Sequence, residues 1–196
     1  MYRVLIADNV SEEGVQILQE APEFEVTVAK DISAAELLVG IPKYHALIVR
    51  SRTQVTAEVI QAADQLKVIG RAGVGVDNID LEAATSKGVV VLNAPEGNTI
   101  STAEHTVAMM LSLARQIPQA NQSLREGRWD RKKFMGVELS NKVLGVVGFG
   151  RVGSTVARIA QGLNMSILAY DPYITTERAR EMGVKAATIE EIITQA

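Results

Sequence analysis

The stretch KVLGVVGFGRVG at residues 142–153 decides the fold, because an apolar run leads directly into three spaced glycines. This pattern predicts a buried strand, a Gly-x-Gly-x-x-Gly turn and then a helix. In such a turn Gly148 permits a sharp bend, Gly150 leaves room for a pyrophosphate, and Gly153 lets the helix pack close to the strand. The phosphates would lie at the N-terminus of the helix, where unpaired N–H groups and the helix dipole favour an anion.

An acidic residue, Asp171, closes the next apolar run at residues 166–170. Its carboxylate can accept hydrogen bonds from an adenosine ribose, and its charge would repel a 2′-phosphate. Pro172 and Tyr173 follow it, and no arginine is present there to hold such a phosphate. The cofactor predicted by these residues is therefore NAD rather than NADP.

The composition excludes several classes of protein. With 47% apolar and 22% charged residues, the chain can bury a core and is not typical of disordered proteins. A net charge of −3 gives no broad field for nucleic acid, and no apolar run is long enough to cross a membrane. The absence of cysteine excludes a disulfide scaffold. We therefore expect a soluble cytoplasmic protein without nucleic-acid or membrane partners.

Short apolar runs alternate with helical patterns from the first residue, which predicts a parallel α/β architecture. The predicted strands are 3–8, 25–29, 46–50, 67–71 and 89–93, and the helices between them are 12–20, 34–39, 57–63 and 81–87. We expect these elements to form a compact unit at residues 1–98, bounded by the turn-rich segment 93–99. Residues 99–196 would then be an incomplete Rossmann-type domain, because at most two strands fit after Gly148. We expect the chain to be a fragment of a longer protein.

In the second part, Ser101-Thr102-Ala103-Glu104 has the spacing of a capping box and predicts a helix from Ser101 through Arg115, ended by Pro118. This helix is apolar on most sides, so we expect it to be buried at an interface or under a sheet. The remaining predicted elements are a polar helix at 120–127, a helix at 176–182, a strand at 184–187 and a capped helix from residue 188.

Three arginines follow the ends of neighbouring predicted strands, namely Arg50, Arg52 and Arg71. The carboxyl ends of parallel strands form the edge at which α/β proteins bind ligands, and arginine binds carboxylates and phosphates in a bidentate manner. The adjacent glycine-rich turn at residues 73–75 could expose backbone N–H groups to the same anion. The two histidines, His45 and His105, lack further ligands at metal-binding spacing, so no metal site is predicted.

Several of these segments together resemble the D-isomer-specific 2-hydroxyacid dehydrogenases. The similar segments are IVRS at 48–51, GRAGVGVDN at 70–78, NAP at 93–95, the glycine turn at 148–153 and YDP at 170–172. Within that family, ARQIPQA at 114–120 and KKFMG at 132–136 are similar to members that oxidise 3-phospho-D-glycerate to 3-phosphohydroxypyruvate in serine synthesis. The resemblance covers essentially the whole chain.

The resemblance implies that residues 1–98 are a flavodoxin-like, parallel-sheet substrate domain, which acts as a lid, and that residues 99–196 are part of an NAD-binding domain. It also implies an oligomer, either a homodimer or a homotetramer, built through the helix at 101–115. The substrate-side positions it implies are Arg50, Arg71, Gly73, Val74, Gly75, Asn98 and Arg131. Arg131 would reach the substrate of a neighbouring subunit, and Val74 stands where some relatives have threonine. The cofactor-side positions it implies are Gly148, Gly150, Arg151, Val152, Gly153 and Asp171.

The family's catalytic arginine, glutamate and histidine follow the second half of the cofactor domain, and none can be assigned to residues 1–196. We therefore expect no catalytic residue in this chain and negligible turnover by it alone. Two alternatives remain open. The parent protein could act on another small 2-hydroxy acid, such as lactate, or on glyoxylate or formate. It could also be a non-catalytic NAD-sensing protein that resembles transcriptional corepressors.

Overall fold

A computed structural model describes residues 1–196, and the chain divides into two compact units, Met1–Asn98 and Thr99–Ala196. The division falls within the turn-rich segment at residues 93–99. Each unit contains its own parallel sheet and its own apolar core.

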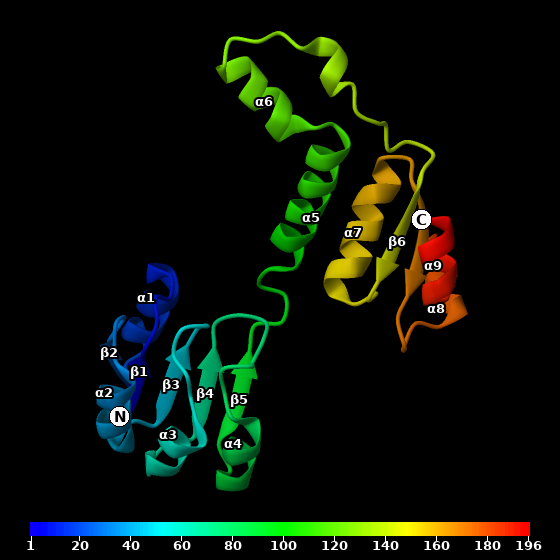
Figure 1. The fold of residues 1–196 in the computed structure, drawn as a ribbon. Coiled ribbons are helices and arrows are strands. Elements are labelled where there is room, and N and C mark those ends of the chain that lie inside the picture. Colours follow the sequence, from blue (N-terminus) through cyan, green and yellow to red (C-terminus); the bar gives the residue numbers. More distant parts are fainter. The chain divides into compact units, whose positions relative to one another are not determined.

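The first unit is built on a five-stranded parallel sheet in the order β2-β1-β3-β4-β5 (Figure 1). This order is that of flavodoxin-like proteins, which confirms the predicted fold of this part. The strands are β1 (Tyr2–Ile6), β2 (Phe24–Val28), β3 (Ala46–Val49), β4 (Val68–Arg71) and β5 (Val90–Asn93). Because all strands are parallel, their carboxyl ends lie at one edge of the sheet.

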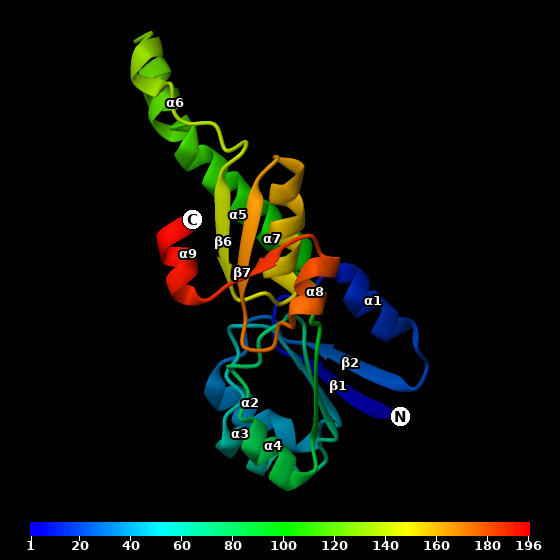
Figure 2. The same ribbon diagram turned by 90° about the vertical axis from the view of Figure 1, so that its right-hand side faces the viewer.

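Helices cover both faces of this sheet. Figure 2 shows α1 on one face, and α2, α3 and α4 on the other. Their bounds are α1 (Glu12–Glu20), α2 (Ala34–Gly40), α3 (Ala57–Ala62) and α4 (Leu81–Lys87), and a short 3₁₀ helix, η1 (Ile41–Lys43), follows α2. Leu5, Leu47 and Ile69 are fully buried beneath the three-helix layer. Removing these apolar side chains from water is the main stabilising contribution to the unit.

The second unit begins with two helices, α5 (Thr99–Ala114) and α6 (Ile117–Arg125), and a 3₁₀ helix, η2 (Arg131–Phe134). A three-stranded parallel sheet in the order β6-β7-β8 follows. The remaining elements are β6 (Val143–Val147), α7 (Arg151–Gly162), β7 (Ser166–Tyr170), α8 (Thr176–Glu181), β8 (Lys185–Ala186) and α9 (Ile189–Gln195). The strand, glycine turn and helix predicted from residues 142–153 are confirmed by β6 and α7.

The helices α5 and α7 pack side by side, as Figure 1 shows, through a small apolar cluster of Ala103, Val107 and Val156. The opposite side of the sheet is covered by α9, which approaches β6 so closely that a side chain at Gly145 would overlap Ile192.

No helix of the chain is both long enough and apolar enough to cross a membrane.

The structure corrects three predictions about residues 99–127. The helix α5 begins at Thr99, so Ser101 lies inside it and is not its N-cap. Pro118 does not end that helix, because the break falls at Gln116, which has a left-handed backbone (φ 52°). Pro118 instead lies in the first turn of α6, where proline costs no hydrogen bond, and α6 therefore begins at residue 117 rather than 120.

The first of these helices, predicted to be buried at an interface or under a sheet, is covered on one side only within this chain. Only Ala103 and Val107 are buried in α5. Met109 and Leu113 are 59% and 78% exposed, on the side of the helix that does not face α7. An apolar helix surface of this kind is typical of a contact with another polypeptide.

Candidate functional sites

A pocket of about 320 Å³ lies at the carboxyl ends of β3, β4 and β5 in the first unit. Its lining residues are Arg50, Ser51, Arg71, Ala72, Gly73, Val74, Ala94, Gly97 and Asn98. The structure thus brings together five of the seven residues predicted for the substrate site. The other two are Gly75, which lies further along the same loop but does not line the pocket, and Arg131, which belongs to the second unit.

The side chain of Arg71 is held close to the loop that follows it. A Cβ atom at residue 73 would overlap the Arg71 guanidinium, so any other residue there would require Arg71 to move from this position. The Nε atom of Arg71 is buried and has no hydrogen-bond partner. Leaving a buried donor unpaired is costly, and an anion in the pocket is the kind of ligand that could satisfy it.

The end of β5 fixes the glycine-rich loop. The Asn93 side-chain amide donates to the Val74 carbonyl at 2.7 Å, and the Ala94 N–H donates to the Gly73 carbonyl at 2.9 Å. The carbonyls of Gly73 and Val74 therefore both accept hydrogen bonds from β5 and the turn that follows it. Sequence reasoning missed Asn93 as a functional candidate, although it ends a strand directly before the predicted domain boundary.

The turn that carries Arg50 is held by buried polar groups. The Asp8 carboxylate accepts hydrogen bonds from the backbone N–H groups of Arg50 and Thr53, at 2.7 and 3.2 Å. Burial by itself would raise the pKa of Asp8, but the hydrogen bonds from Arg50, Thr53 and Arg52 outweigh it and hold this pKa below its ordinary value. Asp8 was not among the predicted site residues, although an acid at a strand end in a parallel sheet was a usable signal.

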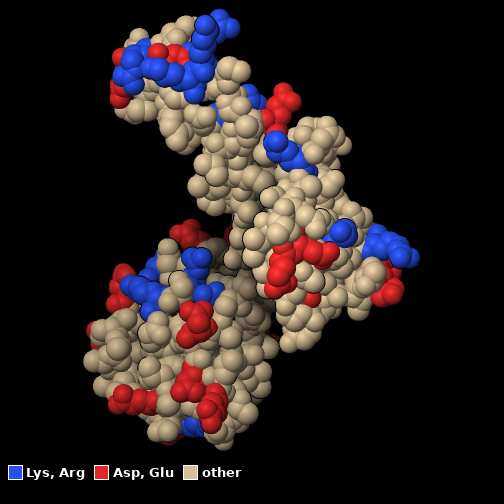
Figure 3. Space-filling view, turned by 45° about the vertical axis from the view of Figure 1, so that its right-hand side comes forward, with Lys and Arg blue, Asp and Glu red and all other residues tan.

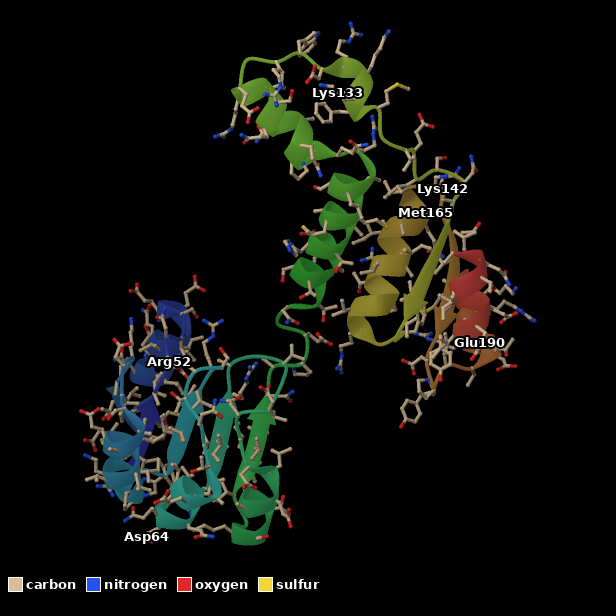
Figure 4. The ribbon with its side chains drawn as sticks, viewed as in Figure 1. Arg52, Asp64, Lys133, Lys142, Met165 and Glu190 are labelled. Atoms are coloured by element: carbon tan, nitrogen blue, oxygen red, sulfur yellow. The ribbon has the colours of Figure 1, made fainter.

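Arg52 does not share the pocket of Arg50 and Arg71. It lines a second pocket of about 470 Å³ with Lys30 and Asp31, and it lies at the end of the unit where the strands finish (Figure 4). Its guanidinium pairs with Asp31 at 2.8 Å and with Asp8 at 3.3 Å. The hydrogen bond to Asp31, followed by that to Asp8, raises the pKa of Arg52 above its ordinary value. Arg50 and Ser51 line this second pocket as well, so the three predicted arginines border two adjoining pockets. The charge of Arg52 is already matched by Asp31 and Asp8.

In the second unit, the glycine turn has the geometry that a phosphate-binding loop requires. Gly148 has a left-handed backbone (φ 93°), which favours glycine, and a Cβ at Gly153 would overlap the Gly148 carbonyl oxygen. A Cβ at Gly150 would meet nothing within 4 Å, so the space beside this residue is open. Gly150 precedes α7 and offers no side chain to cap it, which leaves the N–H groups of the first turn available to an anion.

Asp171 lies against this turn at the end of β7. Its Oδ2 accepts a hydrogen bond from the Phe149 N–H at 2.8 Å, and its Oδ1 accepts one from the Tyr173 N–H at 2.9 Å. Each carboxylate oxygen can accept a second hydrogen bond, so acceptor capacity remains for the hydroxyl groups of a ribose. Asp171, Gly148 and Gly150 thus form one continuous site, and Arg151 and Val152 begin the helix beside it.

Arg131 lies in η2, where it lines a pocket of about 310 Å³ with Trp129 and Phe134. Figure 3 shows the many basic side chains on the α6 and η2 segment, interspersed with acidic ones. Asp130 pairs with Lys133 at 3.0 Å and with Arg128 at 3.5 Å. The basic run is thus partly neutralised by its neighbours.

Neither histidine lies in these pockets. The Nδ1 of His45 accepts a hydrogen bond from the Arg3 N–H at 3.0 Å, which is a structural contact between strands, and His105 is exposed on α5. No group of three histidine, cysteine, aspartate or glutamate side chains is placed to hold a metal ion.

These features define a parallel α/β protein with an anion pocket in one unit and a Rossmann-type glycine turn in the other. The chain belongs to the D-isomer-specific 2-hydroxyacid dehydrogenase family: the model of the catalytic domain of that family matches residues 4–194. It is 54% identical, over 97% of its length, to a D-3-phosphoglycerate dehydrogenase of Archaeoglobus fulgidus, and 48% identical, over its whole length, to one of Bacillus subtilis. The matches cover 36% and 37% of those two proteins, so the chain spans about a third of the curated relatives.

Solved structures show the same fold. An NAD⁺-bound 3-phosphoglycerate dehydrogenase of Entamoeba histolytica is 31% identical over 100% of this chain and 60% of its own, with a TM-score of 0.77. A D-lactate dehydrogenase of Aquifex aeolicus, in complex with NAD and lactic acid, is 27% identical over 98% of this chain and 58% of its own, with a TM-score of 0.83.

Proposed function

We propose that this chain supplies the substrate-binding domain and the first part of the NAD-binding domain of a D-3-phosphoglycerate dehydrogenase. The reaction is the oxidation of 3-phospho-D-glycerate to 3-phosphohydroxypyruvate, with NAD as the hydride acceptor. The observation that carries this proposal is the pocket that combines Arg50 and Arg71 with the loop at Gly73 and Val74. The relatives named for this activity, at about 50% identity, support it.

The charge of the pocket favours a substrate with more than one anionic group. Two arginines line it, and no acidic side chain does. A 2-hydroxy acid with a single carboxylate would pair with one arginine and leave the other without a counter-ion, whereas 3-phosphoglycerate carries both a carboxylate and a phosphate. The buried Nε of Arg71, which has no partner, is a donor that either group could satisfy.

The residues of the glycine turn fit NAD. The pyrophosphate would bind beside Gly150 at the start of α7, and the adenosine ribose would bind to Asp171. The charge of Asp171 disfavours the 2′-phosphate of NADP. NAD supplies the hydride acceptor when bound, and this chain's own contribution is to hold the pyrophosphate and ribose.

Residues 1–196 alone would bind ligands but have negligible turnover, because neither His45 nor His105 is placed in the pocket to accept the hydroxyl proton. We propose that the complete enzyme is an oligomer that uses the exposed apolar face of α5, with Met109 and Leu113 in the contact. A cytoplasmic location fits this metabolic function and the absence of cysteine.

The experiment that tests the proposal is calorimetric titration of the purified chain with 3-phospho-D-glycerate, D-lactate, NAD and NADP. We expect binding of 3-phosphoglycerate and NAD, and weaker binding of lactate and NADP. Arg71→Gln should abolish the binding of 3-phosphoglycerate and leave that of NAD unchanged, because the two ligands use different units. Equal affinity for lactate and 3-phosphoglycerate, or no effect of Arg71→Gln, would contradict the proposed substrate.

A further inference from the structure

The turn Arg50–Thr53 is bracketed by two buried polar side chains that come from distant parts of the sequence. Asp8 and Asn78 are 3% and 5% exposed. As described above, the Asp8 carboxylate accepts the N–H groups of Arg50 and Thr53. The Asn78 Nδ2 donates to the carbonyls of the same two residues, at 2.7 Å for Arg50 and 2.6 Å for Thr53. The backbone polar groups at both ends of the turn are therefore all held by these two side chains.

The turn runs from the surface into the interior, because Arg50 is exposed and Thr53 is only 8% exposed. The backbone groups of Thr53 therefore need partners within the protein. Burying a carboxylate and an amide for this purpose carries a desolvation cost, and the Oδ1 of Asn78 remains buried without a partner. The hydrogen bonds of Asp8 and Asn78 offset this cost only when the turn has the conformation described here. The two side chains therefore favour that conformation of the turn over all others.

The guanidinium of Arg50 depends on this backbone for its direction. Its one hydrogen bond within the protein is from Nη1 to the Asn9 carbonyl, at 3.2 Å. A long side chain with a single such contact is directed mainly by the position of its Cα atom. Asn9 lines the second pocket, and Arg50 and Ser51 line both that pocket and the one that contains Arg71, so the turn borders both.

We propose that Asp8 and Asn78 are positioning residues, which fix the turn Arg50–Thr53 and so place Arg50 for contact with an anion in the pocket. Their effect is preorganisation: the turn is already ordered before the ligand binds, so the entropy cost of ordering it does not reduce the affinity for the ligand. The proposal rests on the proposed function for the identity of the ligand, but the fixed turn itself does not depend on that ligand.

The two side chains have opposite hydrogen-bonding roles, and truncation to alanine removes each role without touching Arg50. Asp8→Ala removes the oxygen that accepts both N–H groups, and Asn78→Ala removes the donor to both carbonyls. Ser33→Ala is the matched control, because it removes the capping box of α2 in the same unit without touching the turn. It lowers the stability of the unit through a different element.

The test measures the affinity of the chain for 3-phospho-D-glycerate and for NAD, together with the order of residues 50–53 by NMR relaxation. We expect Asp8→Ala and Asn78→Ala to weaken 3-phosphoglycerate binding about tenfold, as expected for the loss of a positioned contact. NAD affinity should stay unchanged, and residues 50–53 should become mobile. Ser33→Ala should alter neither affinity nor the order of the turn.

Two outcomes would overturn the proposal: folded variants whose affinity stays within about twofold of the wild type, or a turn that remains ordered in both. Hydrogen exchange in the unmodified protein gives a test that needs no variant. The amides of Arg50 and Thr53 should exchange as slowly as those of the strands. Exchange at the rate of an open loop would show that Asp8 and Asn78 do not fix the turn. If the wild type binds no 3-phosphoglycerate, the proposed function fails. The exchange and relaxation data would still show whether Asp8 and Asn78 fix the turn.

Discussion

The guanidinium of Arg71 occupies the space in which a side chain on residue 73 would begin. A Cβ atom built on Gly73 overlaps the Nη1 of Arg71, and the Gly73 N–H donates to the Arg71 carbonyl at 2.8 Å. The guanidinium of Arg71 can therefore take this position only because residue 73 has no side chain. Glycine permits this close approach of Arg71, and it does not serve an unusual backbone conformation, since the φ of Gly73 is not in the left-handed region.

We therefore expect Gly73→Ala to displace the Arg71 side chain and to weaken binding of 3-phosphoglycerate by about tenfold, the loss of one charge-assisted contact. Calorimetric titration measures the change in affinity. Gly40→Ala is the matched control, because a Cβ there meets nothing within 4 Å. Unchanged affinity in Gly73→Ala would mean that Arg71 does not hold the ligand from its observed position.

Asp171 should determine the choice between NAD and NADP. Asp171→Asn removes the charge that opposes a 2′-phosphate and keeps an oxygen that can accept the Phe149 N–H. We expect NADH to bind more weakly and the preference for NADH over NADPH to fall about tenfold or more. Titration with the two reduced cofactors, followed by fluorescence, gives both constants. A preference that survives the substitution would assign the discrimination to other residues.

Gly153 and Gly162 provide a matched pair within α7. A Cβ at Gly153 would overlap the Gly148 carbonyl and lie 3.2 Å from Val146, whereas a Cβ at Gly162 meets nothing within 4 Å. Gly153→Ala should destabilise the second unit by about 2 kcal/mol or more through overpacking. Gly162→Ala should stabilise it by about 0.5 kcal/mol, because alanine is the better helix former.

Urea unfolding monitored by circular dichroism measures both changes, and the fluorescence of Trp129 is a second probe in this unit. Equal effects of the two substitutions would show that the close approach of Gly153 to Gly148 is not a constraint on the turn.

The buried carboxylate of Asp8 should make the first unit sensitive to acid. Its pKa in the folded protein lies below the ordinary value of 3.8. Its contribution to stability is therefore fully present above that ordinary value and is lost as the pH falls through the lower, folded pKa. The difference in unfolding free energy between the wild type and Asp8→Asn should be constant near neutral pH and shrink in acid. A difference that does not vary with pH would contradict the depressed pKa.

The exposed apolar side of α5 predicts self-association. Leu113→Glu places a charge on this side and should convert a dimer of the chain to a monomer, measured by light scattering after size-exclusion chromatography. Ala108→Glu is the control, since Ala108 is exposed but lies on a different side of the helix. A mass that stays dimeric in Leu113→Glu, or a monomeric wild type, would rule out this interface.

Much of the architecture could be predicted because it depends on local pattern. Period and composition located the strands of both sheets, and the spacing of Gly148, Gly150 and Gly153 identified the turn between β6 and α7. The errors in the predicted helix boundaries occurred where one residue is compatible with two different local structures. Around Pro118, a helix end and a helix start are both compatible with proline, and only the left-handed backbone of Gln116 shows which one is realised.

The candidate anion site was only partly predictable. The sequence indicated Arg50 and Arg71, because arginines at strand ends in a parallel sheet share one edge. It did not show that the charge of Arg52 is matched by Asp31 and Asp8, since these pairs join residues far apart in the chain.

By itself, the sequence determined the class of fold, the family and the glycine turn, because these depend on spacings within a dozen residues. Only the tertiary structure decided which polar groups meet. It placed Asp8 and Asn78 on opposite sides of one turn and set the guanidinium of Arg71 over Gly73. Such contacts depend on the register and crossover of strands, and on how closely two backbones approach, which no local pattern of residues specifies.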